Sequence, residues 1–221
     1  MAAALTRPFG IATGAYVEER DDWRVALERA RAEGWRTIEL TAIRVERLGA
    51  LAELLTEAPD ALVGFERVSV HAPAREYAGA PERVVTALES IPYDIVLHPD
   101  VYREQSWVRG LGSRAVFENM DAVKDFGRDA DDLEAVFRAF PEAGFCLDVA
   151  HVWTNDATLA PGHDLLERHG DRLRQLHVSG IEADGTHRPT TADDLELYEP
   201  LLEQCAGVPW LLEAVLEEGI A

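Results

Sequence analysis

Residues 144–151 read GFCLDVAH, an apolar run that closes with an aspartate and a histidine. The apolar part has the length and composition of a strand that is covered on both faces. Asp148 and His151 then place titratable groups where the apolar packing stops, and their spacing of three residues lets both side chains face one pocket. The stretch therefore predicts a buried strand with a metal-type site at its carboxyl end.

Five further apolar runs end in the same way. They read VSVHAP, DIVLHP, AVFENM, LRQLHVSG and VPWLLEAV, and they end at His71, His98, Glu118, His177 and Glu213, respectively. One such ending is easily a solvated cap, but six of them, separated by helix-length segments, need a shared explanation. The simplest explanation is that all six strand ends converge on one site that binds divalent metal.

Strand and helix signals alternate along the whole chain. We expect strands near residues 9–13, 36–41, 67–71, 94–98, 114–118, 144–148, 173–178 and 208–213. We expect helices near residues 21–34, 45–57, 80–90, 103–110, 130–139, 161–169 and 191–204. Eight strands leave about 28 residues per unit, which fits a right-handed strand–helix–strand crossover. The pattern predicts an α/β protein whose residues 1–221 form a single (β/α)₈ TIM-barrel domain.

The two ends of the chain refine this fold. A doubly wound open sheet, the alternative, usually carries a Gly-rich phosphate turn after its first strand, and the turn ATGAYVEE at residues 12–19 lacks that fingerprint. Only eight residues follow Glu213, too few for a full outer helix, so we expect a compact barrel with a short or missing final helix. A second subunit could cover the apolar surface left there, and we therefore consider a homodimer.

The composition excludes several classes of protein. The formal net charge of −20 repels nucleic acid, whose binding depends on Lys and Arg. No apolar stretch approaches the ~18 residues needed to cross a membrane. The N-terminal MAAALTRPFG lacks the basic and long apolar parts of a signal peptide. Cys146 and Cys205 do not suggest a disulfide framework, so we expect a cytoplasmic protein that acts on a small molecule.

The strand endings supply a surplus of metal-type ligands. In a barrel of this kind the active site lies at the carboxyl ends of the strands. Imidazole and carboxylate together suit Zn²⁺, Mn²⁺ or Fe²⁺ better than Mg²⁺ or Ca²⁺. One ion needs three or four protein ligands, so the surplus allows two or three ions, or one ion with acid–base groups beside it. The candidate ligands are His71, His98, Glu118, Asp148, His151, His177, Asp184, His187 and Glu213.

The order of these motifs resembles that of a known family. The succession HAP, LHPD, ENMD, LDVAH, LHVSG, DGTHRP and LLE is similar to that of the xylose isomerase-like barrels, the superfamily that also contains endonuclease IV. The resemblance covers the chain from about residue 36 to residue 213. Two branches of this superfamily imply two different activities.

The sugar isomerase and epimerase branch implies one divalent metal, often Mn²⁺, held by four successive strands. The matching positions here are Glu118, Asp148, His177 and Glu213. In that branch the two glutamates also move protons at neighbouring substrate carbons, and His151 would hydrogen-bond a substrate oxygen. The metal polarises a carbonyl and a hydroxyl, which lowers the cost of an enediolate. This resemblance implies an isomerase or epimerase of a small polyol, keto sugar or sugar phosphate.

The endonuclease IV branch implies a trinuclear zinc cluster that hydrolyses a phosphodiester. All nine candidate ligands match it, except that Asp184 and His187 are separated by two residues where the family has one. The endonucleases also carry long, basic DNA-reading loops, whereas residues 72–79 here contain a single Arg. The alternative reading is therefore a di- or trinuclear phosphoester hydrolase that does not act on DNA. A third reading is a metal-bound scaffold without activity.

Five residues are considered for contact with a substrate. Tyr16, Trp107 and Trp153 lie in predicted loops on the catalytic side, where they would form the wall of a sugar pocket or simply pack the loops. Arg188 suits a phosphate on the substrate, because a guanidinium binds phosphate with two hydrogen bonds. Glu39, inside a predicted strand, would form either an interior ion pair with an Arg or a substrate contact, and we favour the structural role.

Overall fold

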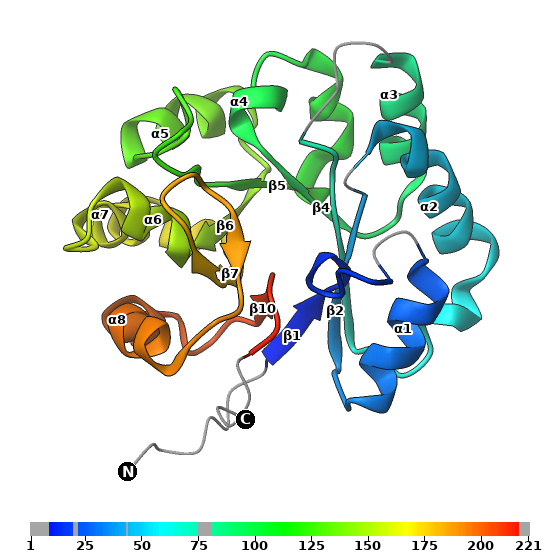
Figure 1. Ribbon diagram of the computed structural model, residues 1–221. Coiled ribbons are helices and arrows are strands. Elements are labelled where there is room, and N and C mark those ends of the chain that lie inside the picture. The colour runs from blue at the N-terminus through cyan, green and yellow to red at the C-terminus, as the bar shows by residue number, and fades with distance from the viewer. Residues whose placement is uncertain (1–8, 20–21, 43, 75–80, 217–221) are drawn as a thin grey trace.

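The computed structural model describes residues 9–19, 22–42, 44–74 and 81–216. Its main strands are β1 (Phe9–Ala12), β2 (Thr37–Thr41), β3 (Arg67–His71), β4 (Asp94–Leu97), β5 (Ala115–Glu118), β6 (Gly144–Asp148), β7 (Leu173–Val178) and β10 (Trp210–Leu212). These eight strands pair in parallel and close into a barrel in the order β1-β10-β7-β6-β5-β4-β3-β2 (Figure 1). The predicted (β/α)₈ barrel is confirmed, and each expected strand is present within a few residues.

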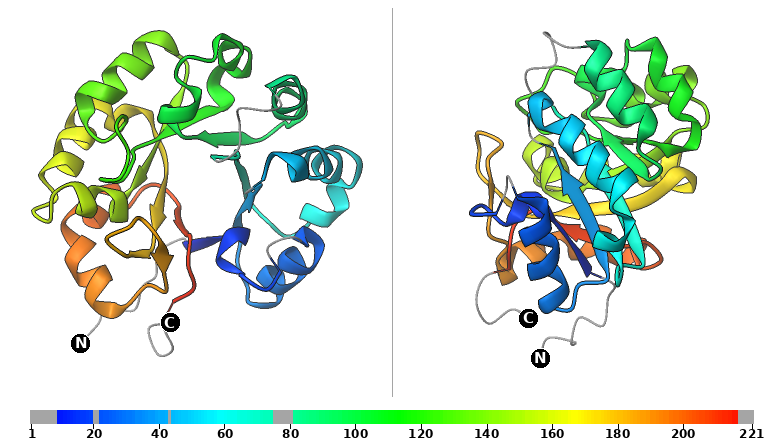
Figure 2. Two further views of the ribbon diagram at one scale, coloured as in Figure 1. Left: turned by 45° about the horizontal axis from the view of Figure 1, so that its top comes forward. Right: turned by 90° about the vertical axis from the view of Figure 1, so that its right-hand side faces the viewer.

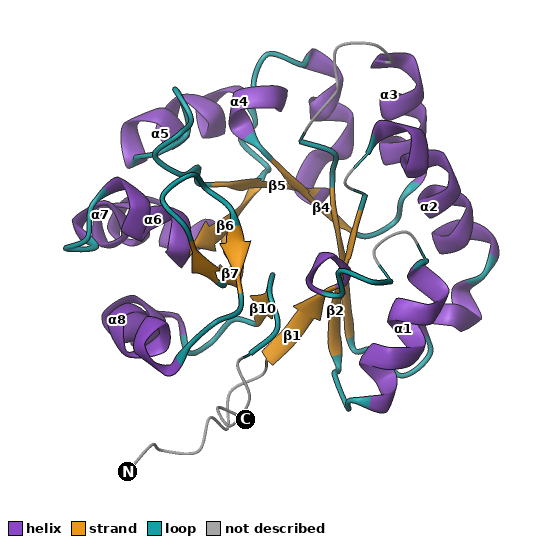
Figure 3. Cartoon of the chain, viewed as in Figure 1, coloured by secondary structure: helices purple, strands orange, loops and turns teal. Residues whose placement is uncertain are grey.

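Helices surround the barrel in all views (Figures 2 and 3). They are α1 (Trp23–Ala32), α2 (Val45–Glu57), α3 (Pro81–Ser90), α4 (Pro99–Tyr102), α5 (Ala130–Ala139), α6 (Val149–Asn155), α7 (Ala160–His169) and α8 (Ala192–Leu202). Acidic and hydroxyl caps set several of their starts: Asp22 accepts a hydrogen bond from the Val25 amide, and Thr191 forms a capping box with Asp194.

The segment after β4 differs from the prediction of a helix at residues 103–110. The short helix α4 begins directly at Pro99, and the 3-10 helix η4 (Ser106–Arg114) follows it. Pro at the first helical position favours this early start. Gly112 has a φ of 57°, a conformation that interrupts regular helix and that glycine adopts without strain. The sequence pattern also did not predict α6 or the hairpin of β8 (Gly180–Ile181) with β9 (His187–Arg188).

The outer ring of helices is open between α8 and α1, beside β10 and β1 (Figure 1). Residues 213–216, the last of the described chain, contain no helix, as expected of a barrel with a short or missing final helix. Residues 217–221 lie outside the described residues, and the homodimer stays a prediction. Among the helices described, none is long and apolar enough to cross a membrane.

The register of the strands brings the predicted site residues together. Asp148 at the end of β6 lies opposite His177 of β7, and Glu118 at the end of β5 lies opposite Cys146 of β6. The Glu213 amide donates to the carbonyl of Val178, which places Glu213 one step beyond β10 and beside the end of β7. Parallel strands with this register end at one mouth of the barrel, so the polar strand endings face a common space.

Candidate metal centre at the carboxyl mouth of the barrel

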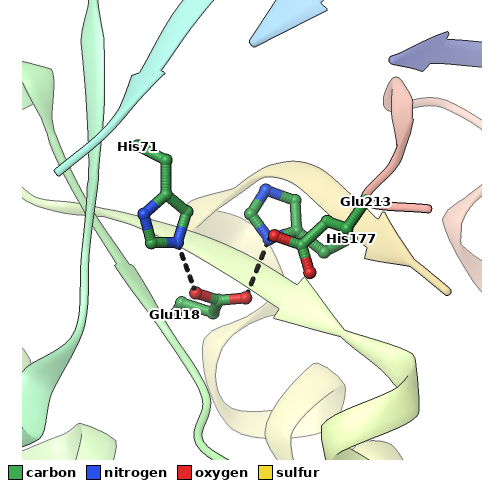
Figure 4. A group of neighbouring side chains, drawn as sticks. All are labelled: His71, Glu118, His177 and Glu213. Atoms are coloured by element: carbon green, nitrogen blue, oxygen red, sulfur yellow. Dashed lines mark hydrogen bonds and ion pairs between the residues drawn. The ribbon is translucent and has the colours of Figure 1, made fainter. Parts of the chain in front are cut away.

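Glu118 is the centre of the site. Its carboxylate is completely buried and lies between the rings of His71 and His177 (Figure 4). Oε1 is 2.8 Å from Nδ1 of His177, and Oε2 is 3.3 Å from Nε2 of His71 and 3.2 Å from Nε2 of His98. Oε1 of Glu213 lies 3.2 Å from the same Nδ1 of His177. One carboxylate thus contacts three imidazoles from the carboxyl ends of three different strands.

Four residues of this group have the geometry of a metal site. Each of His71, Glu118, His177 and Glu213 offers a ligand atom within 4.8 Å of the others. Oε2 of Glu213 is buried and has no hydrogen-bond partner among the described residues. A buried oxygen without a partner costs free energy, and a cation would satisfy it. The donor set fits a divalent ion, and so does this oxygen, which faces Nδ1 of His187 at 3.4 Å without a hydrogen bond.

The charges of the cluster support the same conclusion. Burial opposes the ionisation of Glu118, but His177, His71 and His98 outweigh it and hold the pKa of its carboxyl well below the usual range. In the same way, His177 and His187 lower the pKa of Glu213 to about 2 against the effect of burial. Although burial lowers it, the neighbouring carboxylates raise the pKa of His71 to about 9. The carboxylates of this group are therefore ionised, as metal ligands must be, while His71 would have to release its proton to bind an ion.

A second group lies beside the first and consists of Asp148, His151 and His187. Oδ1 of Asp148 accepts a hydrogen bond from the His151 amide at 2.7 Å, and Oδ2 lies 3.6 Å from Nε2 of His151. The rings of His151 and His187 meet edge to face at 5.4 Å between centroids. Burial raises the pKa of the Asp148 carboxyl well above its usual range, more than the charge of His151 lowers it.

The grouping differs from the four ligands that the sugar isomerase resemblance implied. The first group contains His71 where the resemblance placed Asp148, and Asp148 belongs to the second group. His98 adds a further imidazole on Oε2 of Glu118. Of the nine candidate ligands, eight therefore lie at one mouth of the barrel, in two adjacent groups with His98 beside the first.

Asp184 is the candidate ligand that lies away from the metal-type site. It is exposed in the turn between β8 and β9, where its carboxylate accepts a hydrogen bond from the Thr186 amide at 3.0 Å. The two residues that separate Asp184 from His187 carry the chain through this turn, and only His187 reaches the site. His187 is held by the Ser179 hydroxyl, 2.7 Å from its Nδ1.

Asn119 is a site residue that sequence reasoning missed. Its amide brackets the backbone of Asp148: Nδ2 donates to the Asp148 carbonyl at 2.9 Å, and Oδ1 accepts from the Asp148 amide at 2.8 Å. The Asn119 carbonyl also lies 2.9 Å from Nδ1 of His151. Asn119 therefore holds the end of β5 against the end of β6 and orients Asp148 and His151 of the second group. Its position directly after Glu118 is the only signal in the sequence.

The two groups face a cavity of about 560 Å³ at the carboxyl mouth. Two basic side chains, Lys124 and Arg188, line it. The guanidinium of Arg188 is held by both oxygens of Asp194, at 2.7 and 2.8 Å, so it joins β9 to α8. Lys124, the single lysine of the chain, donates to Asp100 at 2.8 Å.

The aromatic side chains that were predicted to contact a substrate do not face the cavity. Tyr16 is buried, and its hydroxyl donates to Glu33 at 2.7 Å, away from the cavity. Trp153 packs against the hydrophobic core from α6, and Trp107 meets the Tyr102 ring edge-on. None of these three is among the described residues that line the cavity.

Among the residues that the structure describes, Glu39 has no arginine partner, contrary to one form of the structural role predicted for it. Its carboxylate accepts hydrogen bonds from the Ser69 hydroxyl at 2.9 Å and the Gln175 amide at 2.7 Å, and it faces His177. Burial opposes its ionisation, but the charge of His177 and contact with it outweigh burial and lower the pKa of Glu39.

Comparisons with known proteins rest on structure alone, because no protein-family model and no curated protein matches the sequence. Solved structures similar to it include a xylose isomerase-like TIM barrel protein from Mycobacterium smegmatis in complex with magnesium, with a TM-score of 0.55 at 13% identity over 96% of this chain and 91% of that one. The chain has the fold of the xylose isomerase-like TIM barrels.

Two other structures with the xylose isomerase-like fold carry different activities. A D-allulose 3-epimerase from Methylomonas sp. matches with a TM-score of 0.54 at 15% identity, over 96% of this chain and 88% of that one. An AP endonuclease of family 2 from Brucella melitensis matches with a TM-score of 0.56 at 14% identity, over 97% of this chain and 95% of that one. At such identities the likeness establishes the fold and leaves the reaction to the site.

Proposed function

We propose that this protein is a metal-dependent isomerase or epimerase of a small sugar, polyol or sugar phosphate. The observation that carries the proposal is the group around Glu118, in which carboxylates and imidazoles from separate strands converge at the carboxyl mouth of a barrel. Two of its members, Glu118 and Glu213, are carboxylates that can move a proton between neighbouring carbons. The similar fold of a D-allulose 3-epimerase supports the same reaction class.

The donor set favours Mn²⁺, Zn²⁺ or Fe²⁺. For an isomerase, His71, Glu118, His177 and Glu213 would hold the one ion, and the group of Asp148, His151 and His187 would face the substrate beside it. When bound, a divalent ion supplies positive charge that stabilises an oxygen anion on the substrate. The residues of the chain supply the rest of the chemistry.

Glu213 is the better placed of the two glutamates to take a proton from carbon. Both glutamates line the cavity and face imidazoles, but the side chain of Glu118 is only 1% exposed and is hydrogen-bonded through both oxygens, whereas that of Glu213 is 15% exposed. Its low pKa keeps it ionised, as a base must be. Glu213 would then deliver the same proton to the neighbouring carbon, Glu118 would stay ionised as a ligand beside it, and His151, which also lines the cavity, would hydrogen-bond a substrate oxygen.

The size and lining of the cavity fit a small substrate. Pockets of roughly 300–1,000 Å³ bind small molecules, and this cavity measures about 560 Å³. Arg188 was expected to bind a phosphate, but Asp194 already occupies its guanidinium. Lys124 makes a single ion pair with Asp100 within the described chain and is the better candidate to meet an acidic group of the substrate.

Exchange with solvent deuterium tests this reaction. Candidate keto sugars and sugar phosphates are incubated with Mn²⁺-loaded protein in D₂O, and proton NMR follows the carbon beside the carbonyl. Deuterium should enter that position with wild-type protein and not with Glu213→Gln. Glu196→Gln, the same change on an exposed face of α8, should exchange like the wild type. Absence of exchange with every sugar, together with cleavage of phosphoesters, would overturn the proposal.

The second group of ligands favours one alternative, a di- or trinuclear phosphoester hydrolase. Two ions can stabilise both the attacking and the leaving oxygen of a phosphoester. The net charge of −20 makes a small phosphoester a better substrate for such an enzyme than nucleic acid. Metal analysis of the native protein separates the two functions, since one ion per chain supports the isomerase, and two or three support the hydrolase.

A further inference from the structure

Glu39 lies inside the barrel, on the side of His177 opposite to the metal-type cluster. Its side chain and that of His177 are completely buried. Nδ1 of His177 faces Glu118 and Glu213, at 2.8 and 3.2 Å. The other ring nitrogen, Nε2, lies between the two carboxylate oxygens of Glu39, 3.2 Å from Oε1 and 3.3 Å from Oε2, and 3.0 Å from the side-chain nitrogen of Gln175. The imidazole is thus held between carboxylates on both of its edges.

The chemistry of imidazole gives the two edges different roles. A neutral imidazole carries one N–H, so a ring that ligates a metal through Nδ1 must carry its proton on Nε2. Oε1 of Glu39 is buried and has no hydrogen-bond partner among the described residues. An N–H at Nε2 of His177 would satisfy that oxygen, which is within 3.2 Å.

Two further side chains hold Glu39 in place. The Ser69 hydroxyl from β3 and the Gln175 amide from β7 both donate to Oε2, at 2.9 and 2.7 Å. Neither donor engages Oε1, so this oxygen faces the histidine, and the Gln175 amide bridges Oε2 and the histidine ring. A carboxylate clamped from two strands in this way has little freedom to turn, so it fixes the ring that it contacts.

We propose that Glu39 is a positioning residue of the metal centre, which accepts the Nε2 proton of His177 and thereby aims Nδ1 at the ion. The inference rests on the proposed function, because it needs a metal at the group around Glu118. Carboxylates that contact the far nitrogen of a ligating histidine fix its tautomer and orientation, and their loss typically lowers metal affinity about 10–100-fold.

The test is the affinity of chelator-treated protein for Mn²⁺, measured by calorimetry. Glu39→Gln keeps the shape of the side chain and removes its charge, and it should bind Mn²⁺ about 10–100-fold more weakly than the wild type. The matched control is Glu33→Gln, which alters a carboxylate that also accepts three side-chain hydrogen bonds, from Tyr16, Arg29 and Trp35, far from the cluster. This control should bind Mn²⁺ like the wild type.

Imidazole ¹⁵N NMR of the Zn²⁺-loaded protein adds a second measurement. A purely structural role of Glu39 would leave the His177 signal in this spectrum unchanged. The wild type should show His177 protonated at Nε2 in slow exchange, and folded Glu39→Gln should lose that protection. If Glu39→Gln does not fold, Ser69→Ala removes one donor to the carboxylate and should weaken Mn²⁺ binding about fivefold, as the loss of one hydrogen bond predicts.

The outcomes separate this inference from the proposed function. A wild-type chain that binds neither Mn²⁺ nor Zn²⁺ overturns both. A wild type that binds Mn²⁺ tightly, with Glu39→Gln equally tight, overturns only the role of Glu39. Unchanged affinity in Ser69→Ala, where that variant carries the test, overturns it as well.

Discussion

The two mouths of the barrel carry cavities of nearly equal volume, about 560 Å³ at the carboxyl ends of the strands and about 550 Å³ at the amino ends. The amino mouth is lined by charged residues that face solvent, such as Glu66, whose ion pair with Arg36 leaves both side chains about two-thirds exposed. The carboxyl mouth instead buries its charges and sets carboxylates against imidazoles. Volume is therefore no guide to the site, whereas the convergence of buried titratable groups is.

The physical reason for the contrast is the cost of burying charge. An exposed carboxylate such as Glu66 is stabilised by water and needs no partner. A buried carboxylate such as Glu118 must be matched by nearby positive charge, and here the imidazoles of His71, His98 and His177 supply it. A barrel that needed only stability would not gather such groups at one mouth.

Glu118→Gln should have the largest effect. One carboxylate contacts three imidazoles, so its replacement removes both a ligand and the charge that organises the others. We expect affinity for Mn²⁺ to fall more than about 100-fold, beyond the loss caused by a residue outside the ligand shell. Calorimetric titration measures it. Glu66→Gln at the amino mouth is the matched control, and an equal loss in both variants would break the comparison between the mouths.

Metal removal should destabilise the protein. An ion that binds only the folded state stabilises it by about 2.7 kcal/mol at a concentration 100 times its Kd. For a chain of this size that corresponds to roughly 5–10 °C in Tm. Calorimetric scans with chelator and with Mn²⁺ measure the difference. Glu118→Gln should show almost no shift, and an undiminished shift in that variant would place the ion elsewhere.

The ion pairs at the rims of the two mouths should contribute differently to the free energy of unfolding, but this difference is smaller than the effects above. Asp194→Asn weakens a two-oxygen contact with Arg188 and the hydrogen bonds that the carboxylate accepts from Thr191 in the helix cap, and we expect a loss of about 1–2 kcal/mol at pH 7. The exposed pair of Arg36 and Glu66 should contribute less than about 1 kcal/mol, so Glu66→Gln should be nearly neutral. Urea unfolding of both variants measures the contrast, and equal losses would contradict it.

The contribution of Asp194 should depend on pH. Burial raises the pKa of its carboxyl, but Arg188 and Thr191 outweigh burial and bring it below the usual value of 3.8. A lowered folded-state pKa means that the stabilisation is complete above 3.8 and is lost as the pH falls through the folded value. Unfolding curves from pH 7 to pH 2 should therefore show the wild type and Asp194→Asn converging at the acid end. A constant gap would contradict the assignment.

The smallest effect is expected for Tyr16→Phe. The hydroxyl of Tyr16 donates to Glu33 and does not enter the cavity, so its loss should cost about 1 kcal/mol of stability. Mn²⁺ affinity and deuterium exchange should remain those of the wild type. A clear rise in KM for a sugar substrate would show that Tyr16 turns toward the cavity in the active enzyme.

The strands and several helices could be predicted because their signals are local. The helices at residues 45–57 and 130–139 match α2 and α5 in full, since apolar periodicity and acidic starts mark them. The segment after β4 could not be predicted in the same way. There, Pro99 starts a helix early and the positive φ of Gly112 divides the rest, and neither effect has a periodic pattern.

The site shows the same division between local and non-local information. The strands that end in His, Asp and Glu predicted that these side chains meet at one mouth of the barrel, and in the structure they lie there. Which ligands lie nearest to one another depends on strand register, and Asp148 lies nearest to His151 and His187. The directions of Tyr16 and Trp153 depend on packing partners far away in the sequence, which no local pattern reveals.

Paramagnetic broadening by Mn²⁺ tests the central claim, that the carboxyl mouth holds a metal, most directly. The chain has seven histidines, and ¹⁵N NMR of the imidazoles observes them all. Mn²⁺ should broaden His71 and His177 first and His98, His151 and His187 with them, while the exposed His163 and the distant His169, which contacts the Ala130 carbonyl, stay sharp. No broadening, or broadening that begins at His163 or His169, would contradict the claim.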